Sequence, residues 1–388
     1  MINLYNTQDV SLTQAIKEQA QALGFSLVGV TSAQSLPHAD VFEAWLKEGR
    51  HGEMTYLNTP RSRLCRAHPR QILPECRSVL VLGSLYPTPH IQRKDNLDNP
   101  HLCGKIAAYA WGNDYHDILS ERSQSLVRFI ESQVGHSVPN RWYTDTGPIL
   151  ERELAQQAGL GWIGKNTCMI NPDKGSYFFL AEILLGIELE PDQPFTKDRC
   201  GNCNRCITAC PTGCILPDRT LDSRRCISYL TIEFKGSIPL ELRPLMDRWV
   251  FGCDICQQVC PWNRFATSEV DKAFDQYPVQ PACNLLDELR LSRDEFTRKY
   301  RHSPVMRAKR TGYLRNVAVA LGNSHNTEAT SALTQALMED HEPLVRAHAA
   351  WALGQIGNAP ARQTLERAAG IENDMLVKLE IQISLDNR

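Results

Sequence analysis

The sequence predicts three consecutive parts: an α/β part, a cysteine-rich part and an all-helical part. Strand and helix patterns alternate from residue 1 to about 190. Residues 200–262 are then rich in cysteine, proline and glycine, and beyond about residue 285 only helical patterns occur. We therefore expect domains at 1–190, 191–285 and 286–388, a division that suits a chain of 388 residues.

The first part is predicted from short apolar runs that alternate with amphipathic segments. Apolar residues recur at helical spacing over 11–24, and the run FSLVGV follows as a short strand. The runs SVLVLGSLY and SYFFLAEILLG predict two more strands, and an amphipathic helix is expected after the DYH segment at 114–116. RWYTDTG predicts extended chain before PILERELAQQAG, a helix with Pro148 in its first turn.

The composition is that of a globular protein, with 42% hydrophobic and 22% charged residues. The net charge is only -2, so the whole molecule has no positive field for a polyanion and any nucleic-acid surface must be local. The first 25 residues lack the basic start and apolar run of a signal peptide, and no apolar stretch is long enough to span a membrane. We expect a cytoplasmic monomer whose thiols are reduced and serve metals or redox chemistry.

Two cysteine runs predict iron–sulfur clusters. CGNCNRCITACP has the spacing of the bacterial ferredoxin run, in which three thiolates hold one cluster and the fourth reaches a second. GCDICQQVCPWN supplies three more cysteines, and Cys226 completes the set. By this crossover, one [4Fe–4S] cluster takes Cys200, Cys203, Cys206 and Cys260, and the other takes Cys210, Cys226, Cys253 and Cys256.

A zinc ribbon is the alternative interpretation, because two C-x-x-C pairs suffice for it. It leaves four of these cysteines and both Cys-Pro steps without a role. The remaining cysteines show no ligand spacing and are interpreted as small buried hydrophobes. They are Cys65, Cys76, Cys103, Cys168, Cys214 and Cys283. Cys214, just past the first run, is therefore left out of the ligand set.

The third part contains an internal repeat and a basic segment. NVAVALGN at 316–323 aligns with HAAWALGQ at 348–355, a pattern that resembles a short HEAT-type helical repeat. Two ordinary Ala-rich helices packed on each other are the alternative. Residues 290–315 carry nine Lys or Arg and two acids, a local charge of +7 of the kind that phosphate contacts need. A solvated helical face is the alternative explanation of these charges.

Nothing in the α/β part indicates a nicotinamide or flavin dinucleotide site, since no GxGxxG opens a helix after a strand. Asp114 and His116 begin the Asp-x-His-x-x-Gly pattern of His-ligated cobalamin, but Leu119 stands where the glycine is required. We therefore interpret His116 as structural.

The order of several motifs resembles the epoxyqueuosine reductases, the cobalamin and iron–sulfur enzymes of the last step of queuosine synthesis in tRNA. The two cysteine runs and the helical repeat take part in this resemblance, which covers nearly the whole chain. The other motifs are HGEMTYL at 51–57, YAWGNDYHDIL at 109–119, YTDTGPILERELAQQAGLGWIGKNT at 143–167 and RRCISYLTIE at 224–233. The first two parts are also similar to the cobalamin-binding reductive dehalogenases.

The resemblance implies an α/β cobalamin-binding catalytic domain, a ferredoxin-like domain with two [4Fe–4S] clusters and a HEAT-like tRNA-binding domain. The clusters, fed by a donor such as flavodoxin or ferredoxin, would pass electrons to a cobalamin that has no protein ligand to cobalt. Low-valent cobalamin would reduce epoxyqueuosine to queuosine at the wobble position of G-U-N anticodons, those of Asp, Asn, His and Tyr tRNAs. Arg307, Lys309 and Arg310 are the expected tRNA contacts.

The same resemblance suggests active-site residues. In the motif TDTGP the aspartate, here Asp145, is implied as the proton donor beside cobalamin, whereas the residues alone also suit a helix-capping aspartate. Lys165 and Asn166 are expected partners of the corrin amides. Ser228 and Asp254 lie beside cysteines of the second cluster and are expected at the corrin edge.

Two other functions compete with this one. A reductive-dehalogenase-like cobalamin enzyme typically carries a twin-arginine export signal, which we do not find, and that family does not explain the helical repeat. An iron–sulfur electron carrier or scaffold, docked to a partner through the repeat, leaves the α/β domain without a role.

Overall fold

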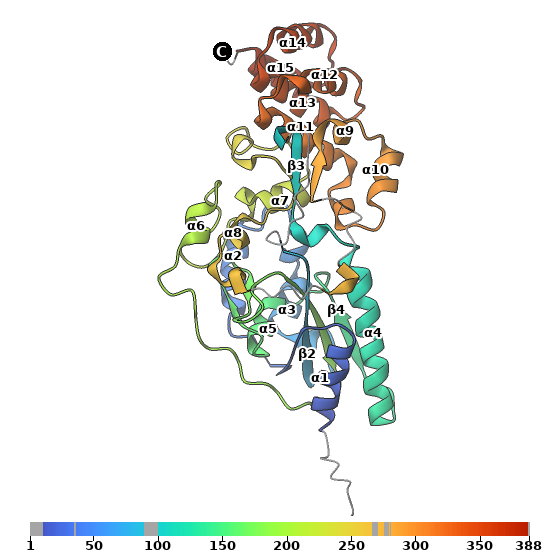
Figure 1. Cartoon of the computed structure of the whole chain (residues 1–388). Coiled ribbons are helices and arrows are strands. Elements are labelled where there is room, and N and C mark those ends of the chain that lie inside the picture. Colours follow the sequence, from blue (N-terminus) through green and yellow to red (C-terminus); the bar gives the residue numbers. More distant parts are fainter. Residues whose placement is uncertain are drawn as a thin grey trace, which may run out of the picture.

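The computed structural model describes residues 11–34, 36–88, 100–265, 271–274, 279 and 281–386. The α/β part lies at one end of the molecule and the C-terminal helices lie at the other, with the cysteine-rich segment between them (Figure 1). This is the predicted order of an α/β part, a cysteine-rich part and a helical part. The domain boundaries at 190 and 285 stay a prediction.

The α/β part is built on a four-stranded antiparallel sheet with the strand order β1-β2-β7-β4. Its strands are β1 (Leu27–Ser32), β2 (Ser78–Leu85), β4 (Asn140–Tyr143) and β7 (Phe178–Leu185). Leu80 and Leu82 of β2 join the core with α1 (Leu12–Ala22) and α4 (Tyr115–Val134), while Val79 and Val81 join the core with α5 (Glu151–Gln157). Both faces of the sheet are covered, which is why β2 and β7 appear in the sequence as continuous apolar runs.

The helix predicted to begin at Pro148 begins instead at Glu151, after a tight turn. Asp145 has φ +56°, in the left-handed region that non-glycine residues rarely adopt. Gly147 packs against the ring of Tyr143, and a Cβ at position 147 would lie 2.3 Å from that ring. The turn delays the helix by three residues, so Asp145 lies in the turn, and its backbone N–H is bonded to the side chain of Glu151 at the start of the helix.

A second sheet joins distant parts of the chain. Strand β3 (Cys103–Ile106) pairs in parallel with β8 (Trp249–Phe251) and antiparallel with β9 (Ala282–Asn284). A two-stranded hairpin is formed by β5 (Trp162–Ile163) and β6 (Met169–Ile170). The helices around these sheets are α2 (Ala39–Lys47), α3 (Pro60–Ala67), α6 (Arg205–Ala209), α7 (Ile227–Ile232) and α8 (Ile255–Gln258).

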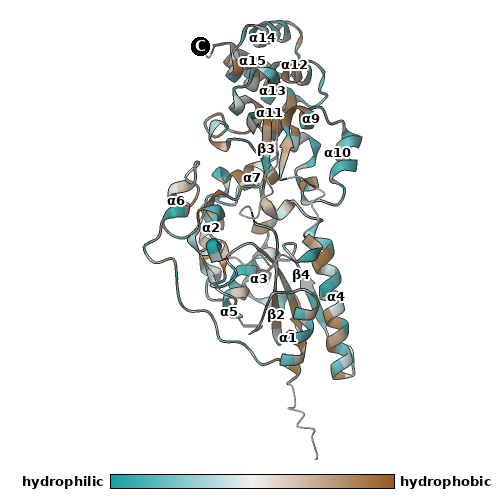
Figure 2. Ribbon diagram, in the orientation of Figure 1, coloured by the Kyte–Doolittle hydropathy of each residue, from teal (hydrophilic) through white to brown (hydrophobic). Residues whose placement is uncertain are grey.

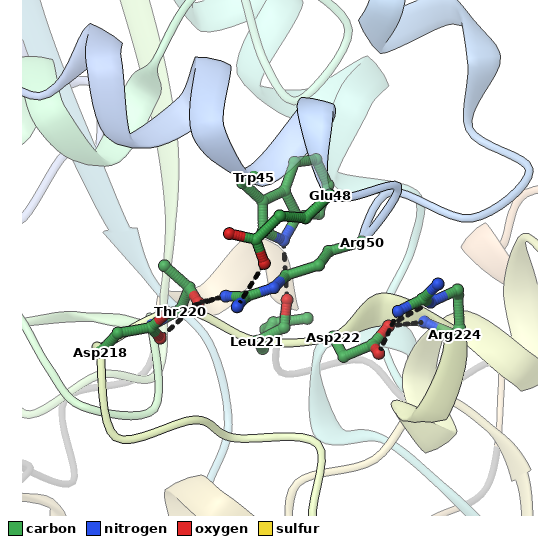
Figure 3. Close-up of polar contacts among 8 residues, drawn as sticks. All are labelled: Trp45, Glu48, Arg50, Asp218, Thr220, Leu221, Asp222 and Arg224. Carbon is green, nitrogen blue, oxygen red and sulfur yellow. Dashed lines mark hydrogen bonds and ion pairs between the residues drawn. The ribbon is translucent and has the colours of Figure 1, made fainter.

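The cysteine-rich segment is fastened to the α/β part by polar contacts (Figure 3). Arg50 Nη1 donates a hydrogen bond to Asp218 Oδ2 at 2.8 Å and contacts Thr220 Oγ1 (Figure 3). Trp45 Nε1 donates to the carbonyl oxygen of Leu221 at 2.7 Å. These bonds hold the loop that leads to Cys226 against the end of α2.

The C-terminal helices pack as successive pairs. They are α9 (Leu285–Leu289), α10 (Arg293–Tyr300), α11 (Lys309–Ser324), α12 (Thr330–Glu339), α13 (Pro343–Ile356), α14 (Ala359–Ile371) and α15 (Met375–Asp386). The two copies of the sequence repeat lie in α11 and α13, where Gly322 leaves room for Trp351 and Ala352. Figure 2 shows α10 as mainly hydrophilic. Among the helices of the described ranges, none is long and apolar enough to cross a membrane.

Candidate active site and metal centres

The first set of predicted cluster ligands lines one small cavity. Cys200, Cys203, Cys206 and Cys260 surround about 60 Å³, together with Lys165, Asn166 and Trp262 among others. Trp162 Nε1 donates a hydrogen bond to Cys200 Sγ at 3.4 Å, and its ring packs edge-on against Trp262. Aromatic side chains thus shield one side of the cavity.

The second set lines a separate cavity of about 50 Å³, formed by Cys210, Cys226, Cys253 and Cys256. A fifth cysteine, Cys214, lines it as well, with its sulfur 3.4 Å from that of Cys210. Cys214 is not among the predicted ligands, because eight ligands already serve two clusters. Its position four residues after Cys210 is the signal in the sequence that points to it.

Local hydrogen bonds favour the thiolate form of two thiols in this second set. The hydrogen bond from Cys214 is the largest cause that lowers the pKa of Cys210, to about 5, and it also lowers the pKa of Cys226. Cys226 directly precedes α7, and the backbone of Tyr229 and Ser228 at the start of this helix also lowers the pKa of Cys226. Burial acts in the opposite direction on Cys253, whose pKa it raises. Iron binding replaces the proton and so favours the thiolate at every ligand.

The two cavities suit clusters better than single ions. Within the described ranges, no three His, Cys, Asp or Glu side chains converge as the ligands of one metal ion do. Asn166 lines both cavities, and its Nδ2 is buried without a hydrogen-bond partner in the part of the chain described. The sulfide and thiolate sulfurs of iron–sulfur clusters would accept its hydrogen bonds.

Asp145 lies at an exposed turn in front of α5, held by two hydrogen bonds. The hydroxyl of Tyr115 donates to Asp145 Oδ2 at 3.0 Å, and the backbone N–H of Asp145 donates to Glu151 Oε1 at 2.7 Å. The helix-capping alternative is wrong, because the residue before α5 is Leu150 and the Asp145 carboxylate bonds a tyrosine instead. The carboxylate remains available at the surface of the site.

Two further carboxyl groups lie behind Asp145 and were not singled out by the sequence motifs. Burial, and then the negative charge of Asp145, raise the pKa of Glu151 to about 7. Glu182 of β7 is 0% exposed, and neither of its oxygens has a hydrogen-bond partner among the described residues. Burial, together with the charges of Glu151 and Asp145, raises the pKa of Glu182 well above its ordinary value. The signal in the sequence is one acid inside the apolar run SYFFLAEILLG.

The structure brings three predicted site residues together around Tyr109. Burial raises the pKa of Tyr109. The negative charges of Asp145 and Asp254 raise this pKa further, and the positive charge of Arg307 lowers it. Asp254 is 2% exposed, accepts the N–H of Ala108 at 2.6 Å, and has a pKa raised to about 7 by burial. Lys165 and Asn166 lie instead against the cluster cavities, and their corrin contacts stay a prediction.

The predicted basic patch is less charged than the sequence suggests. Arg315 is fully buried, so counting it as part of a surface of +7 is wrong. It donates to the carbonyl oxygens of Leu230, Phe234 and Gly236 and so holds α11 against α7 and the segment after it. Arg307 pairs with Glu233, Arg310 with Asp340 and Lys299 with Glu288. Lys309 is exposed, and no described residue forms an ion pair with it.

Comparison with known proteins identifies this arrangement. The 4Fe-4S double cluster binding domain family matches residues 199–263, the family "Epoxyqueuosine reductase QueG, DUF1730" matches residues 66–146, and HEAT repeats match residues 307–386. The epoxyqueuosine reductase of Pseudomonas aeruginosa is 39% identical over 92% of this chain and 97% of its own length. That of Escherichia coli is 40% identical over 89% of each chain.

The chain belongs to the epoxyqueuosine reductase family. Solved epoxyqueuosine reductases agree, one with a TM-score of 0.89 at 31% identity over 97% of this chain and 98% of the other. A second, from Bacillus subtilis, has a TM-score of 0.87 at 31% identity over the same shares of the two chains. The protein is therefore an oxidoreductase with a double 4Fe–4S cluster domain and a HEAT-repeat C-terminal part. Membership of this family decides against the electron-carrier and dehalogenase alternatives.

The ligand set predicts different effects for two neighbouring cysteines of the second cavity. Cys226→Ser should reduce the iron content from about eight to about four atoms per chain, because one [4Fe–4S] cluster loses a ligand. Cys214→Ser, the matched control, should retain about eight irons. Iron and sulfide analysis of anaerobically purified protein measures both. The reverse result would place Cys214 among the ligands.

The buried carboxyl of Glu182 predicts a pH-dependent stability. Its raised pKa means that the folded protein binds more protons than the unfolded chain above about pH 4.3, so this residue makes folding less favourable as pH rises. Glu182→Gln should remove that trend, and the variant should gain stability over the unsubstituted protein by up to about 1.4 kcal/mol per pH unit until the folded pKa is reached.

Urea unfolding of both proteins at pH 5 and pH 8, followed by tryptophan fluorescence, measures this difference. Glu75→Gln, at an exposed position, is the control and should show no such trend. A stability difference between Glu182→Gln and the unsubstituted protein that stays constant with pH would show that Glu182 is ionised in the folded protein.

Proposed function

We propose that the protein reduces epoxyqueuosine to queuosine at the wobble position of G-U-N anticodon tRNAs, using cobalamin and two [4Fe–4S] clusters, with Asp145 as the proton donor. The observation that carries the proposal is the position of Asp145, bonded to Tyr115 and near enough to Arg307 of the C-terminal part for their charges to interact. A solved relative contains a tRNA-Tyr epoxyqueuosine-modified stem loop. The protein would act as a monomer in the cytoplasm. It would bind tRNA there and receive electrons from a donor such as flavodoxin or ferredoxin.

The residues around Asp145 and Asp254 fit a large polar cofactor. Three buried polar atoms near them, His116 Nε2, Thr144 Oγ1 and Tyr177 Oη, have no hydrogen-bond partner among the described residues. The amide side chains of a corrin both donate and accept hydrogen bonds and would satisfy such atoms. Asp145 would face the corrin from one side, with Ser228 and Asp254 at its edge toward the second cluster. When bound, cobalamin would supply the two electrons that the reaction requires.

The protons must come from the protein or from water. Reduction of the epoxide to the alkene consumes two electrons and two protons and releases the oxygen as water. A positioned acid stabilises the oxyanion that develops as the carbon–oxygen bond breaks. Asp145 would donate this proton, and Glu151, with a pKa of about 7 and a hydrogen bond to the Asp145 N–H, would hold the next one.

The bound tRNA would extend over the protein surface from the HEAT repeats to Asp145. Arg307 contributes a half-exposed guanidinium, Lys309 an exposed ammonium and Arg310 a guanidinium that Asp340 holds in place. Phosphate contacts by such groups position a tRNA without reading its sequence. The modified base would leave the anticodon stack to reach Asp145.

Loss of the proton donor should slow the chemical step. Asp145→Asn should lower the single-turnover rate on an epoxyqueuosine-containing stem loop by about 10²–10⁴-fold, because an amide cannot donate a proton as an acid does. Asp117→Asn, at an exposed position in α4, is the control with an unchanged rate. A rate for Asp145→Asn within a factor of three would refute the donor role.

The role of Glu151 predicts the shape of the pH profile. The rate should fall above about pH 7 as Glu151 loses its proton, given its pKa of about 7. In Glu151→Gln this fall should be absent and the rate lower at every pH, because position 151 no longer holds a proton. The profile of single-turnover rate against pH measures both, and an unaltered profile in the variant would exclude Glu151.

The tRNA surface predicts a salt dependence. Lys309→Gln should weaken binding of the stem loop and reduce the slope of log affinity against log salt by about 1, because one phosphate contact is lost. Lys378→Gln, at an exposed position in α15, should leave the slope unchanged. Fluorescence anisotropy over a range of salt concentrations measures the two slopes, and equal slopes would remove Lys309 from the tRNA surface.

A further inference from the structure

The loop of the β5–β6 hairpin, residues 164–168, reaches into the cluster segment and touches both cavities. Strands β5 and β6 pair through Trp162 with Ile170 and Ile163 with Met169, and the Gly164 N–H donates to the Cys168 carbonyl at 2.8 Å. This loop belongs to the α/β part in sequence. It is nevertheless in contact with cysteines that come 32 or more positions later in the chain.

The two ends of the loop contact different cysteine sets. Lys165 Nζ donates to the carbonyl oxygens of Gly201, at 2.7 Å, and Cys203, at 2.9 Å, both in the turn that carries the first set. The thiol of Cys168 donates to the carbonyl oxygen of Asn166 at 3.8 Å, and it lies close enough to the thiol of Cys256 in the second set for each to shift the pKa of the other. Asn166 lies between these contacts and lines both cavities.

The side-chain amide of Asn166 is held in one orientation, and only its oxygen forms a hydrogen bond among the described residues. The side chain is 4% exposed, and its Oδ1 accepts the N–H of Cys168 at 3.3 Å, which fixes the amide with Nδ2 as the free donor. Nδ2 has no partner among the described residues. A buried donor without an acceptor is costly, so such an atom normally meets a ligand or water.

The backbone on both sides of Asn166 adopts conformations that fix the position of the Asn166 side chain. Thr167, a β-branched residue, has φ +62°, a left-handed conformation that such residues rarely adopt. A Cβ at Gly164 would lie 2.7 Å from Asn166 Oδ1. Strain of this kind persists where the surrounding structure fixes a functional conformation.

We propose that Asn166 donates hydrogen bonds from Nδ2 to sulfur atoms of both clusters and so links the two redox centres. An amide nitrogen carries two N–H groups, one for each cavity. A hydrogen bond to sulfur stabilises the reduced cluster, which carries more negative charge, and therefore raises its reduction potential. The proposal rests on the ligand sets given above, and it assigns Asn166 to the clusters in place of the corrin amides.

The test is an EPR-monitored redox titration of the holoprotein without tRNA. In Asn166→Leu, which removes the donor with little change of volume, the reduction equilibrium of at least one cluster should shift about tenfold or more toward the oxidised form, about 59 mV for a one-electron couple. Asn166→Ser retains one hydroxyl donor and should shift less. Asn140→Leu, in the edge strand of the distant four-stranded sheet, is the control with unchanged potentials.

Iron analysis separates failure of this proposal from failure of the ligand sets. Unchanged potentials in Asn166→Leu that retains about eight irons would overturn the proposal and leave the ligand sets intact. If the leucine variant loses iron, Asn166→Ser decides by the same titration, and unchanged potentials in that variant would also overturn it. Wrong ligand sets would appear instead in the iron content of the cysteine variants.

Discussion

The function of this chain depends on holding eight thiols, spread over some sixty residues, around two small cavities. The segment that carries them packs apolar residues such as Leu230 and Phe251 into the main hydrophobic core, and polar contacts from its neighbours add to this packing. Asn263 bonds Ser176 next to β7, Arg50 bonds the loop before Cys226, and Arg315 with Asn316 satisfies carbonyl groups of α7, β8 and the chain between them. Because these contacts come from both flanking parts, the α/β part and the helical repeat fix the geometry of the metal centres between them.

The α/β part and the cysteine-rich segment together place several buried acids around the site. Glu182 lies in the centre of an apolar sheet without a hydrogen bond among the described residues, a position that favours its neutral form. Burial, and then the charge of Asp145, raise the pKa of Glu151, and burial raises the pKa of Asp254. A site that delivers protons near neutral pH requires carboxyl groups of this kind.

The cysteine spacing predicted which thiols share a cavity, since cluster ligation depends on covalent spacing and a known crossover. The four strands of the first sheet, the helices α1 and α4 and the C-terminal repeat also followed from periodicity, whereas the five short strands β3, β5, β6, β8 and β9 were not predicted. Asp145, Glu182 and Asn166 show what periodicity does not reveal. The turn before α5 is set by the φ of Asp145 and the packing of Gly147, and the partners of Glu182 and Asn166 come from segments distant in sequence. Arg315 was counted as surface charge because a charge pattern in the sequence does not show that backbone carbonyl groups distant in sequence accept the hydrogen bonds of a buried guanidinium.

We propose that one chain holds two clusters and one cobalamin. The most direct measurement is the iron and cobalt content of protein produced with cobalamin supplied and purified without oxygen. We expect about eight irons and about one cobalt per chain, with a visible spectrum that contains both cluster and corrin bands. Zinc in place of iron, or a full complement of iron with no cobalt retained after addition of cobalamin, would contradict it.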